Sequence, residues 1–256
     1  MEIQHLSPRA KRAALAVAVV AVLASVGPAA AGASHRSRQT TVQVMVVGRG
    51  GKVLVPATSV TLSTRSAVSV PVAGKACRVD SHTPLAALQA LARTAPGRRL
   101  RPAIKEFKEF GPCAAGAFVS ALSGEEESAT EYWWLEVNDK FAASGAGNPA
   151  ENRLRADNRV LFYLGGEGLT TLDFARVPVR VKSSTNFRVR VLAYGSSGKA
   201  TAATGATVRL GKSIAVTNGS GEVEITVPSR PGEYRLHATL PGDVPAFERL
   251  IHVTRG

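Results

Sequence analysis

The chain has 256 residues and a formal net charge of +13, which allows about two domains of roughly 100 to 150 residues, each large enough for its own core. The positive charge is spread along the chain and favours anionic surfaces through a long-range, salt-sensitive field. A generally basic exported protein explains the same charge. Because basic and aromatic residues are not interleaved, we predict that the protein does not bind nucleic acid.

Residues 1–33 have the pattern of a secretory signal peptide. Basic residues from Arg9 to Arg12 precede an apolar run over residues 13–26, and the sequence PAAAGA at residues 28–33 offers two small-x-small cleavage sites. The run is short and alanine-rich for a membrane-spanning helix, which needs about 20 apolar residues. We predict a cleaved signal, a secreted or extracellular surface location and no transmembrane segment in the mature chain. A signal retained as an anchor is the alternative.

The sequence contains two cysteines, Cys77 and Cys113. An exported chain meets an oxidising compartment, which favours a disulfide between them. Closing the loop between them would stabilise the fold by roughly 3 to 4 kcal/mol in the chain-entropy model. Two buried reduced thiols are the alternative.

The first elements after the signal are strands. Residues 41–48 alternate valines with other residues, which predicts a strand followed by a glycine-rich turn. The β-branched segments 52–62 and 67–72 are interrupted by Pro56 and Pro71. Because proline cannot donate a ladder hydrogen bond, we predict edge strands or extended segments there.

One helix is predicted, from Pro84 to about Thr94. Thr83 is a good N-cap, proline suits the first helical position, and leucines recur at helical spacing until the Pro96-Gly97 stop signal. The basic cluster Arg98–Arg101 that follows is interpreted as a solvated loop, with an anion site as the alternative.

Two short strands are expected next, at residues 104–110 and 118–122, and an acidic loop follows at 124–128. Its carboxylates are adjacent in sequence. A calcium loop needs alternating ligand positions, so we predict no metal site in this loop.

Residues 131–140, EYWWLEVNDK, contain both tryptophans and predict a β-hairpin. With a period of two, Trp133 and Leu135 lie on a core face, and Tyr132 and Trp134 lie on the opposite face, with Glu136 and Asn138. Asn138 and Asp139 both tolerate positive φ and suit a tight turn.

The strand over residues 159–164 follows a flexible turn at 145–149. We expect Tyr163 to join Tyr132 and Trp134 in an exposed aromatic face. The alternative is that Trp134 packs against the preceding helix, so that both faces of the strand are core.

The ordered set TPLAAL (83–88), YWWLEVN (132–138), SGA (144–146) and LRADNRVLFY (154–163) resembles the transcobalamin C-terminal-like domain found in many exported bacterial proteins of unknown function. The resemblance covers about residues 40–166. Asp139 stands where the family turn commonly has glycine, and Asp157-Asn158 replaces the usual pair of an acidic residue and glycine. Both departures preserve turn chemistry.

The resemblance implies a possible ligand. In transcobalamin-like carriers this domain closes over a cobalamin held against a helical domain. We expect no such helical domain in this chain, so cobalamin binding would be weak or would need a partner chain.

A second domain is predicted after the boundary at Gly165–Gly168. Short alternating strands separated by glycine-rich turns, with no helical run, predict a β-sandwich. Residues 217–234 are similar to bacterial immunoglobulin-like repeats, a similarity of fold that does not give function. The predicted organisation is a signal (1–33), a transcobalamin C-terminal-like α+β domain (34–172) and an all-β immunoglobulin-like sandwich (173–256), a mainly β chain with one short helix.

The sequence lacks the motifs of common enzymes. It has no nucleophile elbow, phosphate loop or Cys-x-x-Cys, and its five histidines are scattered. A catalytic triad assembled from distant residues stays open. We predict no enzyme activity, no metal and no cofactor other than cobalamin.

The predicted function is a monomeric, exported, non-enzymatic binding or adhesion module. Its candidate ligand-binding residues are Tyr132, Trp134, Asn138 and Tyr163, and its partner is a small ligand or a cell-surface component. The alternatives are a cobalamin-binding protein that acts with a partner chain, and a hydrolase.

Overall fold

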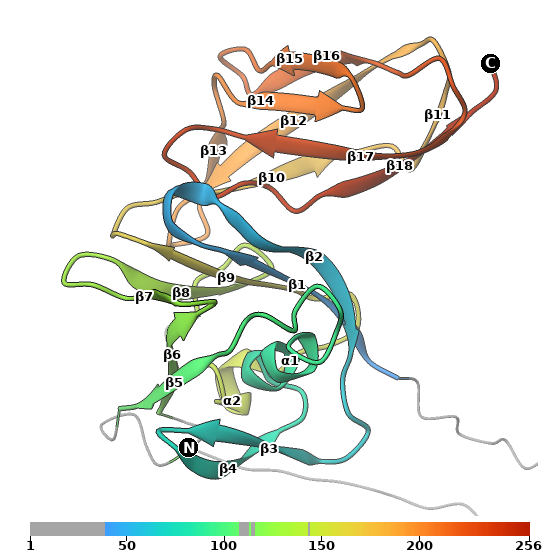
Figure 1. The fold of residues 1–256 in the computed structure, drawn as a ribbon. Coiled ribbons are helices and arrows are strands. Elements are labelled where there is room, and N and C mark those ends of the chain that lie inside the picture. The colour runs from blue at the N-terminus through green and yellow to red at the C-terminus, as the bar shows by residue number, and fades with distance from the viewer. Residues whose placement is uncertain (1–38, 108–112, 114–115, 143) are drawn as a thin grey trace, which may run out of the picture. The chain divides into compact units, whose positions relative to one another are not determined.

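The computed structural model describes residues 39–107, 113, 116–142 and 144–256. Figure 1 shows its elements. The predicted signal peptide lies outside the described residues. Within them, no helix is long and apolar enough to cross a membrane.

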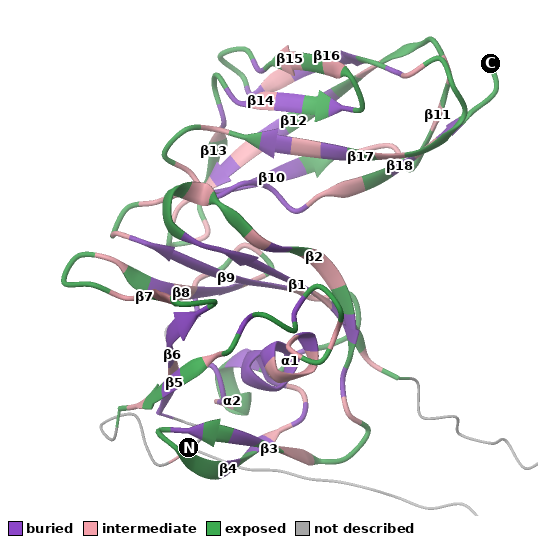
Figure 2. Ribbon diagram, in the orientation of Figure 1, coloured by how far each residue is buried: buried purple, intermediate pink, exposed green. Residues whose placement is uncertain are grey.

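The first large sheet has the strand order β2-β1-β9-β8. Its strands are β1 (Thr41–Val47), β2 (Val53–Thr61), β8 (Tyr132–Val137) and β9 (Arg159–Gly165). β1 and β9 are parallel, whereas β1 with β2 and β9 with β8 are antiparallel. The short 3-10 helix η1 (Arg49–Gly51) connects β1 to β2. β8 therefore forms one edge of this sheet, and β9 beside it is buried along almost its whole length (Figure 2).

Two smaller sheets accompany the first. β3 (Ala67–Val72) pairs with β4 (Lys75–Asp80), and β5 (Ala103–Glu106) pairs with β6 (Ala117–Leu122), which also pairs with β7 (Glu125–Glu126). The strand predicted at residues 104–110 is thus observed as β5, and residues 108–110 lie outside the described part of the chain. The disulfide between Cys77 of β4 and Cys113 confirms the predicted pairing.

The predicted helix is α1 (Pro84–Leu91), capped by Thr83, whose Oγ1 accepts a hydrogen bond from the Ala86 N–H at 3.4 Å. It ends three residues earlier than Thr94. The Thr94 hydroxyl donates to the Leu91 carbonyl at 2.7 Å, and this side-chain bond helps close the last turn. A second helix, α2 (Pro149–Asn152), was not predicted and begins at the last residue of the predicted turn at 145–149.

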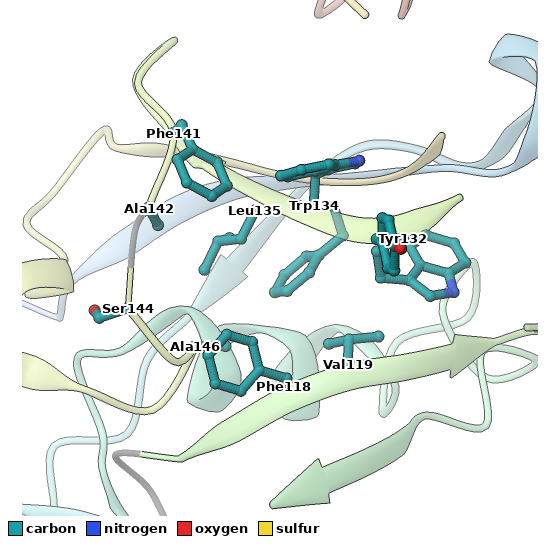
Figure 3. Close-up of a pocket in the computed structure, with 11 residues that line it drawn as sticks. Phe118, Val119, Tyr132, Trp134, Leu135, Phe141, Ala142, Ser144 and Ala146 are labelled. Carbon is teal, nitrogen blue, oxygen red and sulfur yellow. The ribbon is translucent and has the colours of Figure 1, made fainter. Parts of the chain in front are cut away.

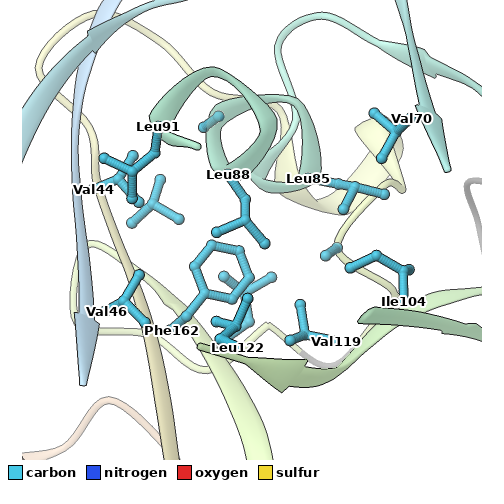
Figure 4. Close-up of a cluster of buried hydrophobic side chains, with 14 of the residues drawn as sticks. Val44, Val46, Val70, Leu85, Leu88, Leu91, Ile104, Val119, Leu122 and Phe162 are labelled. Carbon is cyan, nitrogen blue, oxygen red and sulfur yellow. The ribbon is translucent and has the colours of Figure 1, made fainter. Parts of the chain in front are cut away.

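The first hydrophobic core lies between the large sheet, α1 and the small sheets (Figure 4). It contains Val44 and Val46 of β1, Phe162 of β9 and Leu88 of α1. The strand predicted from the alternating valines is therefore observed as β1, and these valines face this core. The opposite face of β1 is also buried, because Met45 and Val47 belong to a separate cluster.

The remaining strands form two further sheets. One contains β10 (Thr171–Arg176), β12 (Asn186–Tyr194), β13 (Ala200–Ala202) and β16 (Glu222–Thr226), with β12 pairing to the other three. The other has the order β11-β18-β17-β14-β15, formed by β11 (Arg180–Lys182), β14 (Thr207–Leu210), β15 (Ser213–Val216), β17 (Gly232–Thr239) and β18 (Arg249–Thr254).

Residues from both sheets, such as Val191, Val208 and Leu236, share a second core. The chain is therefore mainly β with a sandwich in its C-terminal part, as predicted. The exact domain boundary at 172/173 stays a prediction.

Candidate functional site

The candidate site is built around β8, where the predicted alternation is observed. Trp133 and Leu135 are 8% and 7% exposed and lie in the first core, whereas Tyr132 on the other face is 42% exposed. Trp134 is half-buried. The interpretation of Trp133 and Leu135 as core residues is confirmed.

Three aromatic rings form a chain along this strand (Figure 3). The rings of Tyr132 and Trp134 meet edge-to-face with centroids 6.1 Å apart, and those of Trp134 and Phe141 do so at 5.3 Å. Phe141 reaches this position because the chain turns back after Asp139 and forms a bridge between Phe141 and Glu136. Sequence reasoning missed Phe141. Its place just beyond the predicted turn at Asn138-Asp139 could have indicated that Phe141 folds back beside the strand.

The aromatic side chains border a pocket of about 180 Å³. In Figure 3, β8 lies above Phe118 and Val119 of β6, and the segment after the hairpin turn closes one end. The lining is apolar and aromatic with one aliphatic hydroxyl: Phe118, Val119, Tyr132, Trp133, Trp134, Leu135, Phe141, Ala142, Ser144, Ala146 and Phe162.

Asn138 forms the hairpin turn outside this pocket. Asn138 and Asp139 have φ of 53° and 62°, as the prediction of a tight turn requires. The Asn138 Oδ1 accepts a hydrogen bond from the Arg159 N–H at 2.9 Å, and the Asn138 N–H donates to the Arg159 carbonyl at 3.0 Å. The structure thus shows Asn138 holding the turn, apart from Tyr132 and Trp134.

The prediction that Tyr163 belongs to an exposed aromatic face is wrong. Tyr163 is 4% exposed and packs with Val244 and Phe247, and its hydroxyl donates to Glu136 Oε1 at 3.3 Å. Glu136, also expected to face water, is 2% exposed. A segment about 80 residues further along the chain covers this part of the sheet. The alternative prediction placed the helix against Trp134. In the structure α1 packs into the first core, on the face of the sheet opposite to Tyr163.

Burial changes the acid–base behaviour of this covered face. Desolvation raises the pKa of Glu136 to about 7, opposed by the hydrogen bond that Thr171 Oγ1 donates to Oε2 at 2.8 Å. The pKa of the Tyr163 hydroxyl is also raised, by burial and by the neighbouring carboxylate of Glu136.

A charged cluster lies next to Glu136. Arg159 Nη2 donates to Asp139 Oδ2 at 2.5 Å, and Nη1 lies 2.6 Å from Asp173 Oδ2. The second contact is an ion pair without an aligned N–H bond. Arg249 also donates to Asp173 at 2.9 Å. Burial alone would lower the pKa of Arg159, but the two carboxylates raise it.

Acidic side chains of the loop at 124–128, and Glu131 just after it, form ion pairs and hydrogen bonds with basic residues. Glu131 pairs with Arg49 at 2.6 Å, Glu127 pairs with Lys105, and Glu125 accepts a hydrogen bond from the Arg49 N–H at 2.7 Å. In the part of the chain that the structure describes, no three His, Cys, Asp or Glu side chains lie close enough together to hold a metal ion.

The chain is similar to known proteins only at the level of solved structures. No family model matches the sequence, and no curated protein matches it. One similar solved structure is the Bacteroides ovatus mixed-linkage glucan utilization locus SGBP-B in complex with a mixed-linkage heptasaccharide, with 12% identity, a TM-score of 0.22 and coverage of 54% of this chain and 32% of that chain. Another is the D0-D1 domain of Intimin, with 14% identity, a TM-score of 0.22 and coverage of 53% and 87%.

This chain thus spans about a third of the length of the first structure. Similarity at this level carries no information about the site. The resemblance to the transcobalamin C-terminal-like domain stays a prediction.

Proposed function

We propose that this chain is an exported, non-enzymatic binding module that captures its ligand in the pocket beside β8. The observation that carries the proposal is the chain of rings formed by Tyr132, Trp134 and Phe141 at the border of the pocket. Partly exposed aromatic side chains offer a large apolar contact area with fixed geometry, and they dominate many binding sites. A mainly apolar concave pocket is the usual form of a small-ligand site.

The chemistry of the lining favours binding over catalysis. None of the lining residues is Asp, Glu, His, Lys, Arg or Cys, the residue types that most often supply general acids and bases. Ser144 is the one aliphatic hydroxyl in the lining, and its Oγ accepts a hydrogen bond from Asn152 Nδ2 at 2.9 Å. An activated serine would also donate its O–H to a neighbouring base, and the lining contains no His, Asp, Glu or Lys to accept it.

Export is part of the proposal. The tripartite pattern of residues 1–33 supports it, as does the disulfide between Cys77 and Cys113, since disulfides persist in oxidising compartments. The proposed location is therefore outside the cell or at its surface.

The test is a binding panel on the full chain after signal removal, with soluble glycans, cell-surface extracts and cobalamin, read by calorimetry. Tyr132→Ala removes an exposed ring of the border, whereas Val216→Ala truncates a side chain on β15 that is 59% exposed. We expect at least one panel member to bind, with affinity reduced at least tenfold by Tyr132→Ala and unchanged by Val216→Ala. Equal binding to wild type and to both variants would place the ligand elsewhere and refute the proposal.

Cobalamin is included because of the sequence resemblance. The pocket of about 180 Å³ is smaller than the roughly 300 to 1,000 Å³ of sites that enclose drug-sized ligands, so a corrinoid could contact only the border. We expect no saturable heat with cobalamin alone. A saturable heat abolished by Tyr132→Ala would establish cobalamin as the ligand.

A further inference from the structure

We infer that the pocket beside β8 takes one uncharged aromatic ring, supplied either by a small molecule or by a side chain of a partner polypeptide. This inference rests on the proposed function and names the ligand class. The first reason is size. An apolar cavity of roughly 150 Å³ in another protein holds benzene, and this pocket measures about 180 Å³. One ring fits, but a fused polycyclic ligand or an oligosaccharide would extend outside it.

The second reason is the state of the polar side chains in the lining. The Trp133 indole N–H donates to the Glu125 carbonyl at 3.1 Å, and the Trp134 indole N–H donates to the Gly165 carbonyl at 2.7 Å. The Tyr132 hydroxyl donates to the Ala129 carbonyl at 2.9 Å. Ser144 accepts from Asn152. The two indole N–H groups and the Tyr132 O–H are therefore already used within the protein, and the Ser144 O–H is one side-chain donor that the lining can still offer a ligand.

This state of the lining selects against a sugar ring. Each hydroxyl that leaves water without a new partner costs about 1 to 3 kcal/mol, and a sugar carries several of them. A charged ring would lose still more on desolvation. An aromatic ring has no such requirement, so its transfer into the pocket is favourable.

The third reason is the orientation of the rings. The Tyr132 and Trp134 rings are inclined at 86°, and those of Trp134 and Phe141 at 65°. Successive rings in this chain are therefore inclined to one another rather than stacked in parallel. A guest ring can meet an edge with its face, or a face with its edge, and each such pair contributes about 0.5 to 1.5 kcal/mol beyond area burial.

The edge of β8 gives a way to distinguish the two sources of the ring. Hydrogen-bonded pairs alternate along an antiparallel ladder. Since the Asn138 N–H bonds the Arg159 carbonyl, the even-numbered residues of β8 pair with β9, and the main-chain groups of the odd-numbered residues point away from β9. Val137 and Leu135 already bond Lys140 and Ala142 on that side, so Trp133 is the next position along this edge. An extended polypeptide could bond to Trp133 there while inserting its aromatic side chain, whereas a free ring could not.

The experiment titrates the full chain after signal removal with p-cresol, glucose and benzoate, and follows the two indole N–H resonances by NMR. We expect saturable shifts with p-cresol, with a Kd on the order of 1 mM for so few atoms, and no shifts with glucose or benzoate. Ala142→Leu fills the pocket from its wall and should weaken p-cresol binding at least tenfold. Val216→Leu, on the exposed strand β15, is the matched control and should leave it unchanged.

If Ala142→Leu does not fold, Tyr132→Ala replaces it, because Tyr132 is largely exposed and contributes one ring of the border. The inference would be overturned if glucose or benzoate bound as tightly as p-cresol does. It would also be overturned if the pocket variants left the affinity for p-cresol unchanged. So would no binding of p-cresol. If the larger panel still gives a ligand sensitive to Tyr132→Ala, the proposed function survives and the ring inference alone fails.

The source of the ring is decided by comparing p-cresol with the capped peptides Ac-Val-Tyr-Val-NH₂ and Ac-Val-Ala-Val-NH₂. At least tenfold tighter binding of the tyrosine peptide than of p-cresol, with no binding of the alanine peptide, assigns the ring to a polypeptide. Equal or weaker binding of the tyrosine peptide assigns it to a small molecule.

Discussion

Replacing Glu136 by glutamine should make the protein more stable at alkaline pH and change little at acidic pH. Burial raises the pKa of Glu136 from 4.5 to about 7 in the folded protein. The folded state therefore holds this proton more tightly than the unfolded state does. The contribution of Glu136 to the free energy of unfolding is most favourable below pH 4.5. It is lost progressively as the pH rises to about 7, and it stays at its lowest value above that pH.

The expected magnitude follows from the shift. The difference between a pKa of 4.5 and one of about 7 corresponds to about 3 kcal/mol, at roughly 1.36 kcal/mol for each tenfold change in proton affinity. Glutamine cannot ionise, and its carbonyl oxygen can still accept the hydrogen bond from Thr171. We therefore expect Glu136→Gln to exceed wild type by about 3 kcal/mol in free energy of unfolding at pH 8.5, and to lie close to it at pH 4.5.

Urea unfolding of both proteins at several pH values between 4.5 and 8.5 measures this difference, because other titrating groups cancel when the two profiles are subtracted. Glu126→Gln, which removes an exposed carboxylate of the acidic loop, is the control and should show no trend. Parallel profiles for wild type and Glu136→Gln would refute the assigned shift.

Three further predictions concern stability. Arg159→Leu removes the shared partner of two largely buried carboxylates, Asp139 and Asp173, and should cost about 3 kcal/mol in free energy of unfolding by urea. The expected cost is at the lower end of the usual range because Arg249 still pairs with Asp173. A cost below 1 kcal/mol would mean that this cluster is solvated. The double variant Cys77→Ser, Cys113→Ser should lose about 2 to 4 kcal/mol in free energy of unfolding, measured as a lower Tm in the absence of reductant. An unchanged Tm would show that the disulfide does not stabilise the folded protein. Thr83→Ala should cost about 1 kcal/mol through loss of the α1 cap, with exposed Thr130→Ala as the control, and equal effects of the two would argue against capping.

Local features of the chain were predictable because their causes lie within a few residues. The start of α1 follows from the capping oxygen of Thr83 and the fixed φ of Pro84. The turn at Asn138-Asp139 follows from two residues that accept positive φ. The burial of Trp133 follows from strand alternation, and the disulfide from the presence of only two cysteines in the chain.

The candidate site was predicted only in part. Tyr132 is exposed as expected and Trp134 is half-buried, and both border a pocket that was not predicted. Asn138 holds the turn, Phe141 was missed, and Tyr163 is buried. The order of residues along a strand is enough to assign each side chain to one of the two faces, because side chains alternate. What covers each face depends on segments that meet only when the chain folds.

The sequence alone therefore determined the strand and helix types, the disulfide partners and the outward position of Tyr132, because these depend on short-range geometry and residue chemistry. Only the tertiary structure decided that Val244 and Phe247 cover Tyr163 and that Glu136 is enclosed beside it. Their burial, and the raised pKa that follows from it, comes from contacts between residues far apart in the chain, which no local pattern encodes.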